Sequence, residues 1–319
     1  MRKGISAVIA TILMLVIVIA VSGTAYLYIS GVLTGRVAET FSVLDTFNDS
    51  AVIRNDGTAP ISSMTAILDG NPVETVFDLN KYLVAYWKFN EGSGTKARDS
   101  VQGLEVNLRG EWVDGKFGFG YKFVGGGWVR TDFASAIGNG ITYVFWFRLP
   151  DTSDTYGTFF CVEDVADRYL EDNLGQKAYG DLGCYGRAWT NSGFNVNDAN
   201  WHWFAFSKST TSILCRDGDC VNLGDATNNI PNIKHIIFNG GCGCGYGNFR
   251  QGIILDEVRI YNKALSEAEI KALYAAKGET ILEPGGTLIV KPIAALSQGR
   301  HTLRLCTASM CQAAHLSIT

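Results

Sequence analysis

The hydrophobic pattern of the chain changes sharply after residue 36. No charged side chain lies between Lys3 and Arg36, and residues 5–33 form an apolar run rich in Ile, Val and Leu. About 20 apolar residues of helix cross a hydrocarbon core about 30 Å thick, so this run is long enough to span a membrane. Because the backbone must satisfy its own hydrogen bonds in lipid, we expect a helix despite the many β-branched residues. Arg2 and Lys3 place the N-terminal flank in the cytoplasm.

After residue 36 the pattern becomes the two-residue alternation of half-buried strands. Strands are expected at 41–47, 51–55 and 61–68, separated by turn sequences at 48–50, 56–57 and 69–72. The alternation resumes after residue 278, where a turn at 283–286 precedes strands expected at 287–290, 301–306 and 314–318. Many short segments punctuated by Gly, Asn and Asp are typical of an all-β protein.

The composition indicates the cellular compartment of the protein and argues against a nucleic-acid partner. The formal net charge of −4 gives no basic surface for nucleic acid, so no nucleic-acid partner is expected. All eight cysteines follow the apolar run, which agrees with an extracellular location in which disulfides form. Asn48 begins the N-x-S sequon Asn48-Asp49-Ser50, which predicts a glycosylation site in a turn.

The N-terminal run has three interpretations. A cleaved signal peptide has a shorter apolar core, and here the apolar pattern continues past the small residues at 22–25. A single-span membrane anchor explains the composition equally well. The basic residues, Gly4 and the apolar run that follows at once resemble the class III leader of archaeal type IV pilins. That resemblance implies cleavage after Gly4 by a prepilin peptidase, so that the mature chain begins at Ile5, although Ile9 stands where bacterial pilins carry Glu.

Stretches between residues 82 and 277 resemble a LamG-like, concanavalin A-like jellyroll. They arrive in the order of that family, at 84–95, 115–118, 142–147, 201–206 and 255–274. The last is the most specific: a strand and turn lead into a short helix with Ser266 as N-cap and Glu269 completing a capping box.

The segments that flank this region resemble the β head of archaeal pilins. The expected organisation is a leader at 1–4, a hydrophobic helix at 5–36, a first part of the head at 37–81, the jellyroll at 82–277 and a second part of the head at 278–319. Because the first and last strands of a jellyroll are neighbours, its termini lie close together, and a surface loop accepts such an insertion. The predicted fold is mainly β with one long N-terminal transmembrane or filament helix.

The cysteines divide into two groups. Cys215 and Cys220 bracket one turn sequence and Cys306 and Cys311 bracket another, so a hairpin disulfide is expected in each. The remaining four have three possible connectivities; they are Cys161, Cys184, Cys242 and Cys244. Zinc is disfavoured because there is no C-x-x-C spacing and the chain has four His.

The jellyroll resemblance also suggests ligands. It implies a structural calcium ion near the joined termini, with Asn90, Asp99 and Asp256 as candidate oxygen ligands. The alternative is that Asp99 caps a turn and Asp256 begins a strand. Aromatic residues in loop-like contexts are the candidates for glycan binding: Trp112, Trp128, Tyr185 and Trp189. Strand aromatics are expected in the core instead: Trp87, Trp146, Trp201 and Trp203.

Catalysis is not expected. Retaining glycoside hydrolysis needs two carboxylates about 5–5.5 Å apart. The acidic clusters at 163–167 and 171–172 do not have the required alternation and are interpreted as a solvated loop.

The sequence therefore predicts a non-enzymatic subunit, major or minor, of an archaeal type IV pilus-like extracellular filament. Its precursor would lie in the membrane, its helix would contact other pilin subunits, and its jellyroll would serve adhesion or contact surface glycans. The alternative is a membrane-anchored, glycan-binding surface protein that does not polymerise.

Overall fold

The computed structural model describes residues 39–124, 129–138, 140–150, 157–164, 173–177, 181–185, 189–224, 233–239 and 252–319. The predicted leader and hydrophobic helix at 1–36 lie outside these ranges. Among the described residues, no helix has the length and apolar character needed to cross a bilayer. Their helices are the 3-10 helix η1 (Val76–Tyr82) and the α-helix α2 (Glu267–Ala275), and the prediction of a mainly β protein is confirmed.

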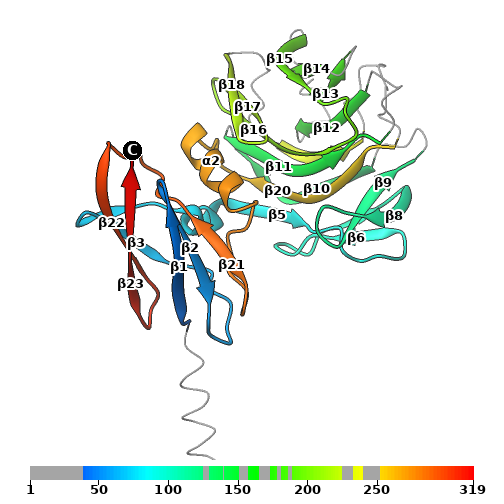
Figure 1. Cartoon of the computed structure of the whole chain (residues 1–319). Coiled ribbons are helices and arrows are strands. Elements are labelled where there is room, and N and C mark those ends of the chain that lie inside the picture. The colour runs from blue at the N-terminus through cyan, green and yellow to red at the C-terminus, as the bar shows by residue number, and fades with distance from the viewer. Residues whose placement is uncertain are drawn as a thin grey trace, which may run out of the picture.

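A small sandwich (residues 39–82 and 278–319) is built from both ends of the described chain (Figure 1). Its three-stranded sheet has the order β1-β2-β21, and its four-stranded sheet has the order β23-β22-β3-β4. Each sheet therefore pairs early strands with late ones. The strands are β1 (Phe41–Phe47), β2 (Ser50–Asn55), β3 (Thr65–Leu68), β4 (Asn71–Val73), β21 (Thr287–Val290), β22 (Gly299–Cys306) and β23 (Cys311–Ile318).

A large sandwich (residues 83–277) lies between these two halves in the sequence and beside them in space (Figure 1). Among the described residues, one of its sheets has the order β18-β17-β16-β11-β20-β9-β8, with β5 also pairing with β20. The strands of this sheet are β5 (Leu83–Trp87), β8 (Gly110–Asp114), β9 (Phe119–Phe123), β11 (Ile141–Arg148), β16 (Trp201–Lys208), β17 (Ser212–Arg216), β18 (Asp219–Gly224) and β20 (Ile254–Tyr261).

The facing sheet has the order β10-β19-β12-β13-β14-β15. Within the described part of the chain, strands β6 and β7 pair only with each other and form a separate two-stranded sheet. These strands are β6 (Lys96–Arg98), β7 (Glu105–Asn107), β10 (Val129–Ile137), β12 (Gly157–Asp164), β13 (Asn173–Lys177), β14 (Asp181–Tyr185), β15 (Trp189–Asn195) and β19 (Ile233–Phe238).

Strand β11 is buried on both faces, which explains its almost uninterrupted apolar sequence. Phe145 and Phe147 belong to the core between the two large sheets. Val144 and Trp146 alternate with them and belong to a second core on the outer face of the same sheet. That second core also contains residues of α2 and of the small sandwich, including Ile270, Leu303 and Leu305. The two sandwiches therefore share a continuous apolar cluster.

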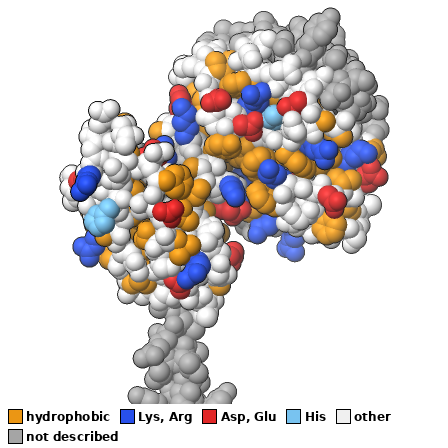
Figure 2. All heavy atoms as spheres, viewed as in Figure 1, with side chains coloured by type: hydrophobic (Ala, Val, Ile, Leu, Met, Phe, Trp, Pro, Cys, Tyr) orange, Lys and Arg blue, Asp and Glu red, His pale blue; other side chains and the backbone are white. Residues whose placement is uncertain are grey.

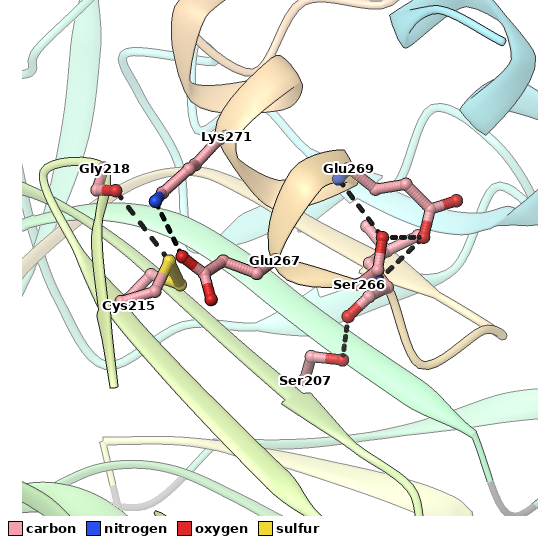
Figure 3. Close-up of a disulfide and its surroundings, with 9 residues drawn as sticks. Ser207, Cys215, Gly218, Ser266, Glu267, Glu269 and Lys271 are labelled. Atoms are coloured by element: carbon pink, nitrogen blue, oxygen red, sulfur yellow. Dashed lines mark hydrogen bonds and ion pairs between the residues drawn. A yellow bond between two sulfur atoms is a disulfide. The ribbon is translucent and has the colours of Figure 1, made fainter. Parts of the chain in front are cut away.

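Helix α2 confirms the predicted capping box. The Ser266 hydroxyl accepts a hydrogen bond from the Glu269 backbone N–H at 3.3 Å, and the Glu269 carboxylate accepts one from the Ser266 N–H at 2.8 Å (Figure 3). The helix lies over the β17–β18 hairpin, where the backbone of Gly218 has a φ of +90°. A Cβ at this position would lie 2.6 Å from the Tyr274 ring, so only glycine lets the hairpin approach the helix this closely.

The ends of the large sandwich lie side by side. Strand β5 pairs antiparallel with β20, and the Asn262 N–H donates to the Tyr82 carbonyl at 2.8 Å. The Asn80 side chain donates to the Thr280 carbonyl at 2.7 Å, which ties the two connections together. This proximity lets the large sandwich interrupt the small one without separating its strands.

The strand expected at 61–68 is shorter than predicted. It begins only at Thr65, while Ile61 forms an isolated bridge with Leu282. The chain first pairs with the returning segment and then crosses to the other sheet, and this crossing interrupts the strand. The turn expected at 69–72 also includes the start of β4, which begins at Asn71.

Candidate functional site

The turn between β8 and β9 is held by two side chains from distant parts of the sequence. Asp256, on β20, accepts hydrogen bonds from the backbone N–H groups of Lys116 and Phe117 at 2.8 and 2.9 Å. Asn90 accepts one from the Phe119 N–H at 2.8 Å. The backbone of the turn is therefore fixed from both sides.

Two glycines make this arrangement possible. A Cβ on Gly115 would lie 2.3 Å from the Phe119 carbonyl oxygen, and a Cβ on Gly118 would lie 2.5 Å from the Asn90 side-chain oxygen. Gly118 also has a φ of +68°, a conformation that disfavours other residues. The spacing of Gly115-Lys116-Phe117-Gly118 is thus required by the close approach of Asn90 and Asp256.

The turn presents one cationic and two aromatic side chains, which we call the loop patch (Lys116, Phe117 and Phe119). Phe117 is 36% exposed and Phe119 is 45% exposed. The Lys116 ammonium lies 4.5 Å from the centre of the Trp146 ring, and Phe117 meets the same ring edge-on at 6.0 Å. Exposed aromatic faces beside a cation can stack on a ligand and attract its negative charge. The sequence shows the Gly115–Gly118 motif, but nothing in it indicates that the Phe117 and Phe119 rings are exposed.

Asp256 is fully buried beneath this turn, and burial raises the pKa of its carboxyl to about 8. Its second oxygen, Oδ1, has no hydrogen-bond partner among the described residues. The indole N–H of Trp146, its cross-strand neighbour, also has none within this part of the chain. Two unpartnered polar atoms below one rigid turn mark this end of the sheet as the best candidate for a bound ion or polar group.

The three residues predicted to bind calcium divide between two places. Asn90 and Asp256 hold the same turn, as described above. Asp99 instead accepts hydrogen bonds from the backbone N–H groups of Tyr86, Val101 and Gln102, so it caps a turn. No group of three or more His, Cys, Asp and Glu side chains suited to a metal occurs in the described ranges. The calcium prediction now depends on Asn90 and Asp256 with backbone oxygens, and it stays a prediction.

A second buried network lies on the same sheet face. The Arg259 guanidinium donates to the Tyr86 hydroxyl at 2.6 Å and to the carboxylates of Glu257 and Glu279 at 2.8 and 2.9 Å. Arg259 is 1% exposed, and its guanidinium lies 3.9 Å from the centre of the Tyr86 ring. Since Glu279 belongs to the segment returning to the small sandwich, this network fastens the two sandwiches together.

The predicted glycan-binding aromatics have mixed outcomes. Trp112 is half-buried: it donates to the Gly94 carbonyl at 2.8 Å and packs edge-on against Tyr121 at 4.9 Å, and its role in glycan binding stays a prediction. Trp128 lies outside the described residues. Tyr185 and Trp189 lie opposite each other on β14 and β15, and only their backbone positions are described.

The tryptophans predicted for the core are confirmed. Trp87 and Trp203 are fully buried and Trp146 is 7% exposed, whereas Trp201 is partly buried against the second core. On the face seen in Figure 2, hydrophobic side chains form a band across the large sandwich that is interrupted by charged side chains of both signs.

Both predicted hairpin disulfides are confirmed. Cys215–Cys220 and Cys306–Cys311 join directly paired strand positions whose Cα atoms are 4.1 and 4.0 Å apart. Figure 3 shows the first beside the N-terminal turn of α2, near the Glu267–Lys271 ion pair. Cys161 lies on β12 and Cys184 on β14, with their side chains not described, and Cys242 and Cys244 lie outside the described residues.

The remaining predicted sites are the leader cleavage site, the glycosylation sequon and the acidic clusters. Gly4 and Ile5 lie outside the described residues, and Asn48 is exposed at the tip of the β1–β2 hairpin with a φ of 50°. The first acidic cluster begins within a strand and not in a loop, because Glu163 and Asp164 end β12. Residues 165–172 lie outside the description, and the expectation that the chain is not an enzyme stays a prediction.

Comparison with known proteins identifies the large sandwich. Residues 123–271 match the family described as the concanavalin A-like lectin/glucanases superfamily. The chain carries a concanavalin A-like jellyroll. This jellyroll, as the large sandwich is called from here on, consists of the two facing sheets described above. No curated protein matches the chain.

Solved structures with similar folds are distant and partial. A Trypanosoma rangeli sialidase is 16% identical with a TM-score of 0.48, covering 66% of this chain and 34% of that chain. The binding domain of Paraclostridial Mosquitocidal Protein 1 is 17% identical with a TM-score of 0.48, covering 62% and 53%. The receptor binding domain of botulinum neurotoxin D is 14% identical with a TM-score of 0.47, covering 62% and 54%. This chain spans about a third of the sialidase and about half of each toxin domain.

Proposed function

We propose that the chain is a subunit of a type IV pilin-like extracellular filament that displays the jellyroll as a binding domain. The observation that carries this proposal is the small sandwich, whose two sheets combine strands from both sides of the jellyroll. Its first strand, β1, begins five residues after Arg36, where the uncharged N-terminal run ends. This arrangement supports a head domain on an apolar stalk, with the jellyroll as its insertion.

The stalk has a specific processing requirement. A prepilin peptidase would cut between Gly4 and Ile5 and leave the apolar run at the new N-terminus. The precursor would lie in the membrane, and neighbouring subunits would replace lipid around the run once the filament forms. Its lack of charge over residues 4–35 suits both surroundings.

The jellyroll would bind surface glycans. The loop patch supports this, because Phe117 and Phe119 are exposed aromatic rings and the Lys116 ammonium lies over the same Trp146 ring that Phe117 contacts. Aromatic faces suit the apolar face of a sugar ring, and a lysine suits its carboxylate or sulfate groups. Trp128, Tyr185 and Trp189 remain candidates for the same role. Asn90 and Asp256 would hold calcium, whose charge would compensate the buried carboxylate and stiffen the turn.

Mass analysis of the mature N-terminus tests the stalk. A chain that begins at Ile5, recovered from filaments sheared off the cells and seen by electron microscopy, would support the proposal. A chain that begins at Met1 or near residue 25 would contradict it. Cells that expose the protein without filaments would instead favour a membrane-anchored glycan-binding protein.

Glycan arrays test the binding domain separately. We expect Phe117→Ala to weaken binding about two- to tenfold, since one stacking contact is worth about 0.5–1.5 kcal/mol. Val124→Ala is the matched control, because Val124 is 43% exposed and lies outside the loop patch. Equal binding by both variants would exclude the loop patch as the glycan site.

A further inference from the structure

We propose that neighbouring copies of this chain join through their small sandwiches, with Phe47 of one copy seated in a pocket beside β4 of the next. This contact rests on the filament proposed above and specifies how its subunits meet. Two separate features of the small sandwich carry this proposal. One is an exposed apolar projection at one edge, and the other is a partly apolar pocket at another edge.

The projection lies on β1, the outermost strand of its sheet. Leu44 is 48% exposed and Phe47 is 45% exposed. The pairing of β1 with β2 shifts between Val43 and Asp45, so Leu44 has no cross-strand partner and bulges from the sheet. Phe47 pairs with Ser50 beside the hairpin tip. Large apolar side chains this exposed on an edge strand mark a contact surface.

The surface continues from Phe47 across the sheet. Val52 lies two residues from Ser50 on β2, so it shares the face of the sheet on which Phe47 lies. Ile289 pairs with Val52 across β21, and both side chains are only partly buried. The projection is therefore supported by an apolar face and is more than a single exposed ring.

The pocket has a volume of about 360 Å³ and lies between β4 and the loop before β22. Its polar wall has internal partners: His301 hydrogen-bonds to the Asp69 carboxylate at 2.6 Å and to the Ser297 carbonyl at 2.9 Å. Asn71 also lines the pocket, so the wall is mixed, with polar groups beside an apolar part. The apolar lining consists of Leu68, Pro72, Val73, Ala294, Ala295 and Leu296.

One copy cannot fill its own pocket with its own Phe47. β1 lies beside β23, where the Gln312 side chain donates to the Phe41 carbonyl at 3.1 Å. β23 and β4 are the opposite edges of the four-stranded sheet. The projection and the pocket are thus on different sides of the small sandwich. A contact between two different patches of identical copies is heterologous and repeats, so it produces an open fibre when it does not close into a ring.

The chain outside the described residues explains why the occupant is a second copy. Residues 1–38 lead into β1, and their apolar run would hold every copy in the same orientation in a membrane or filament core. Phe47 lies six residues along the strand from Phe41, about 20 Å from the point of attachment. A neighbouring copy attached in the same orientation would present its pocket to this exposed end of β1.

Two surface variants of the full chain test the contact. Phe47→Ala removes the projection, and Ala295→Trp fills the pocket at an exposed position. We expect each alone to reduce the yield of sheared filaments at least tenfold, with an unchanged melting temperature. Val101→Ala, at a position that is 45% exposed on the jellyroll, should leave the yield unchanged.

Mixing the two variants provides the sharper result. The intact Phe47 of the Ala295→Trp chain fits the intact pocket of the Phe47→Ala chain, so the mixture should form pairs but no filaments. Pairing also demonstrates that both variants are folded.

The outcomes separate the two proposals. Normal filaments from either single variant, or no pairs in the mixture, would overturn the contact and leave the filament standing. Absence of filaments from the unmodified chain would overturn the filament itself.

Discussion

The jellyroll and the small sandwich are both β-sandwiches, but they are stabilised differently. The jellyroll interior is rich in aromatic side chains and lies between its own two sheets, with Trp87, Phe89 and Phe145 fully buried. The small sandwich has a mainly aliphatic interior, and its cluster extends without interruption onto the outer face of a jellyroll sheet, at Trp146 and Trp203. The jellyroll, which is one continuous segment, thus buries its core between its own sheets. The small sandwich, which is split in sequence, buries part of its apolar surface against the jellyroll inserted into it.

This difference predicts an unequal dependence. The strands of the small sandwich meet only when the jellyroll brings its own two ends together, through β5 and β20. Substitutions at the junction between the two sandwiches should therefore destabilise the small sandwich more than the jellyroll. The jellyroll interior has no such requirement, since all of its described strands come from residues 83–277.

The largest effect is expected from breaking the buried network at the junction. Arg259→Ala leaves Glu257 buried without its cation, which should cost about 3–5 kcal/mol of unfolding free energy. Denaturant unfolding of the detergent-solubilised full chain measures this change. Lys271→Ala is the control, since it breaks only an exposed pair with Glu267 and should cost less than about 0.5 kcal/mol. Similar values for the two variants would mean that the network does not hold the sandwiches together.

The second-largest effect is expected from the carboxyl group of Asp256, which lies within the jellyroll and not at the junction. Burial raises its pKa to about 8, against about 3.9 in an unfolded chain, so between these values the folded state keeps a proton that the unfolded state has lost. Without metal, stability should fall as the pH rises from 4 to 8. Asp256→Asn should flatten this dependence and add about 1–3 kcal/mol at pH 8.

Calcium should reverse the effect in the unmodified chain. Millimolar calcium at pH 8 is expected to raise the melting temperature, and a chelator should lower it again, because the ion would stabilise the ionised carboxylate. The Asp256→Asn variant is the control and should not respond. If the unmodified chain responds no more than the variant does, the calcium prediction is wrong.

Removing each disulfide in turn compares how much the two sandwiches depend on their cross-links, because each sandwich contains one of them. Each closes a loop with a sequence separation of 5, for which loop entropy predicts a contribution of about 2 kcal/mol. Replacing Cys215 and Cys220 with Ala should cost more than replacing Cys306 and Cys311, because Cys215 is fully buried in the second core under α2. Thermal unfolding of the two double variants measures the difference. A larger loss from the Cys306 and Cys311 pair would show that the small sandwich is the less well supported region.

The smallest effects should come from one histidine in each sandwich. Burial opposes charging of His202, but hydrogen bonds with Asp217 and Asp198 outweigh it and raise its pKa. Hydrogen bonds to Asp69 and the Ser297 carbonyl raise the pKa of the more exposed His301. Both contributions should be complete below pH about 6.5 and decline as the pH rises through the folded pKa values.

Melting curves of His202→Gln and His301→Gln test these contributions. The first variant should lose the larger share of the pH dependence, since His202 is the more buried of the two. If neither variant changes the slope above pH 6, the histidines are not charged in the folded protein.

Much of the local structure was predictable, because local signals determine it. Ser266 and Glu269 form their capping box from a spacing that depends only on helix geometry. The cysteine pairs bracket short turn sequences, and a hairpin brings residues on either side of its turn together. By contrast, nothing in the sequence neighbours of Trp112 shows that it would pack against Tyr121 and donate to the Gly94 carbonyl. Side-chain exposure in loops is set by residues far away in the sequence, and the Phe117 and Phe119 rings were missed for the same reason.

The sequence by itself determined the alternating strands, the turns, the capped helix, the two hairpin disulfides and the likeness of residues 82–277 to a jellyroll. These features follow from short-range periodicity and spacing. Only the tertiary structure decided that Asp256 and Asn90 converge on one turn, that Arg259 joins the sandwiches, and that Phe47 and the pocket lie on different sides. Each of those facts depends on pairing between strands far apart in the chain. Such pairing is selected by burial of the whole apolar surface at once, and no single stretch encodes it.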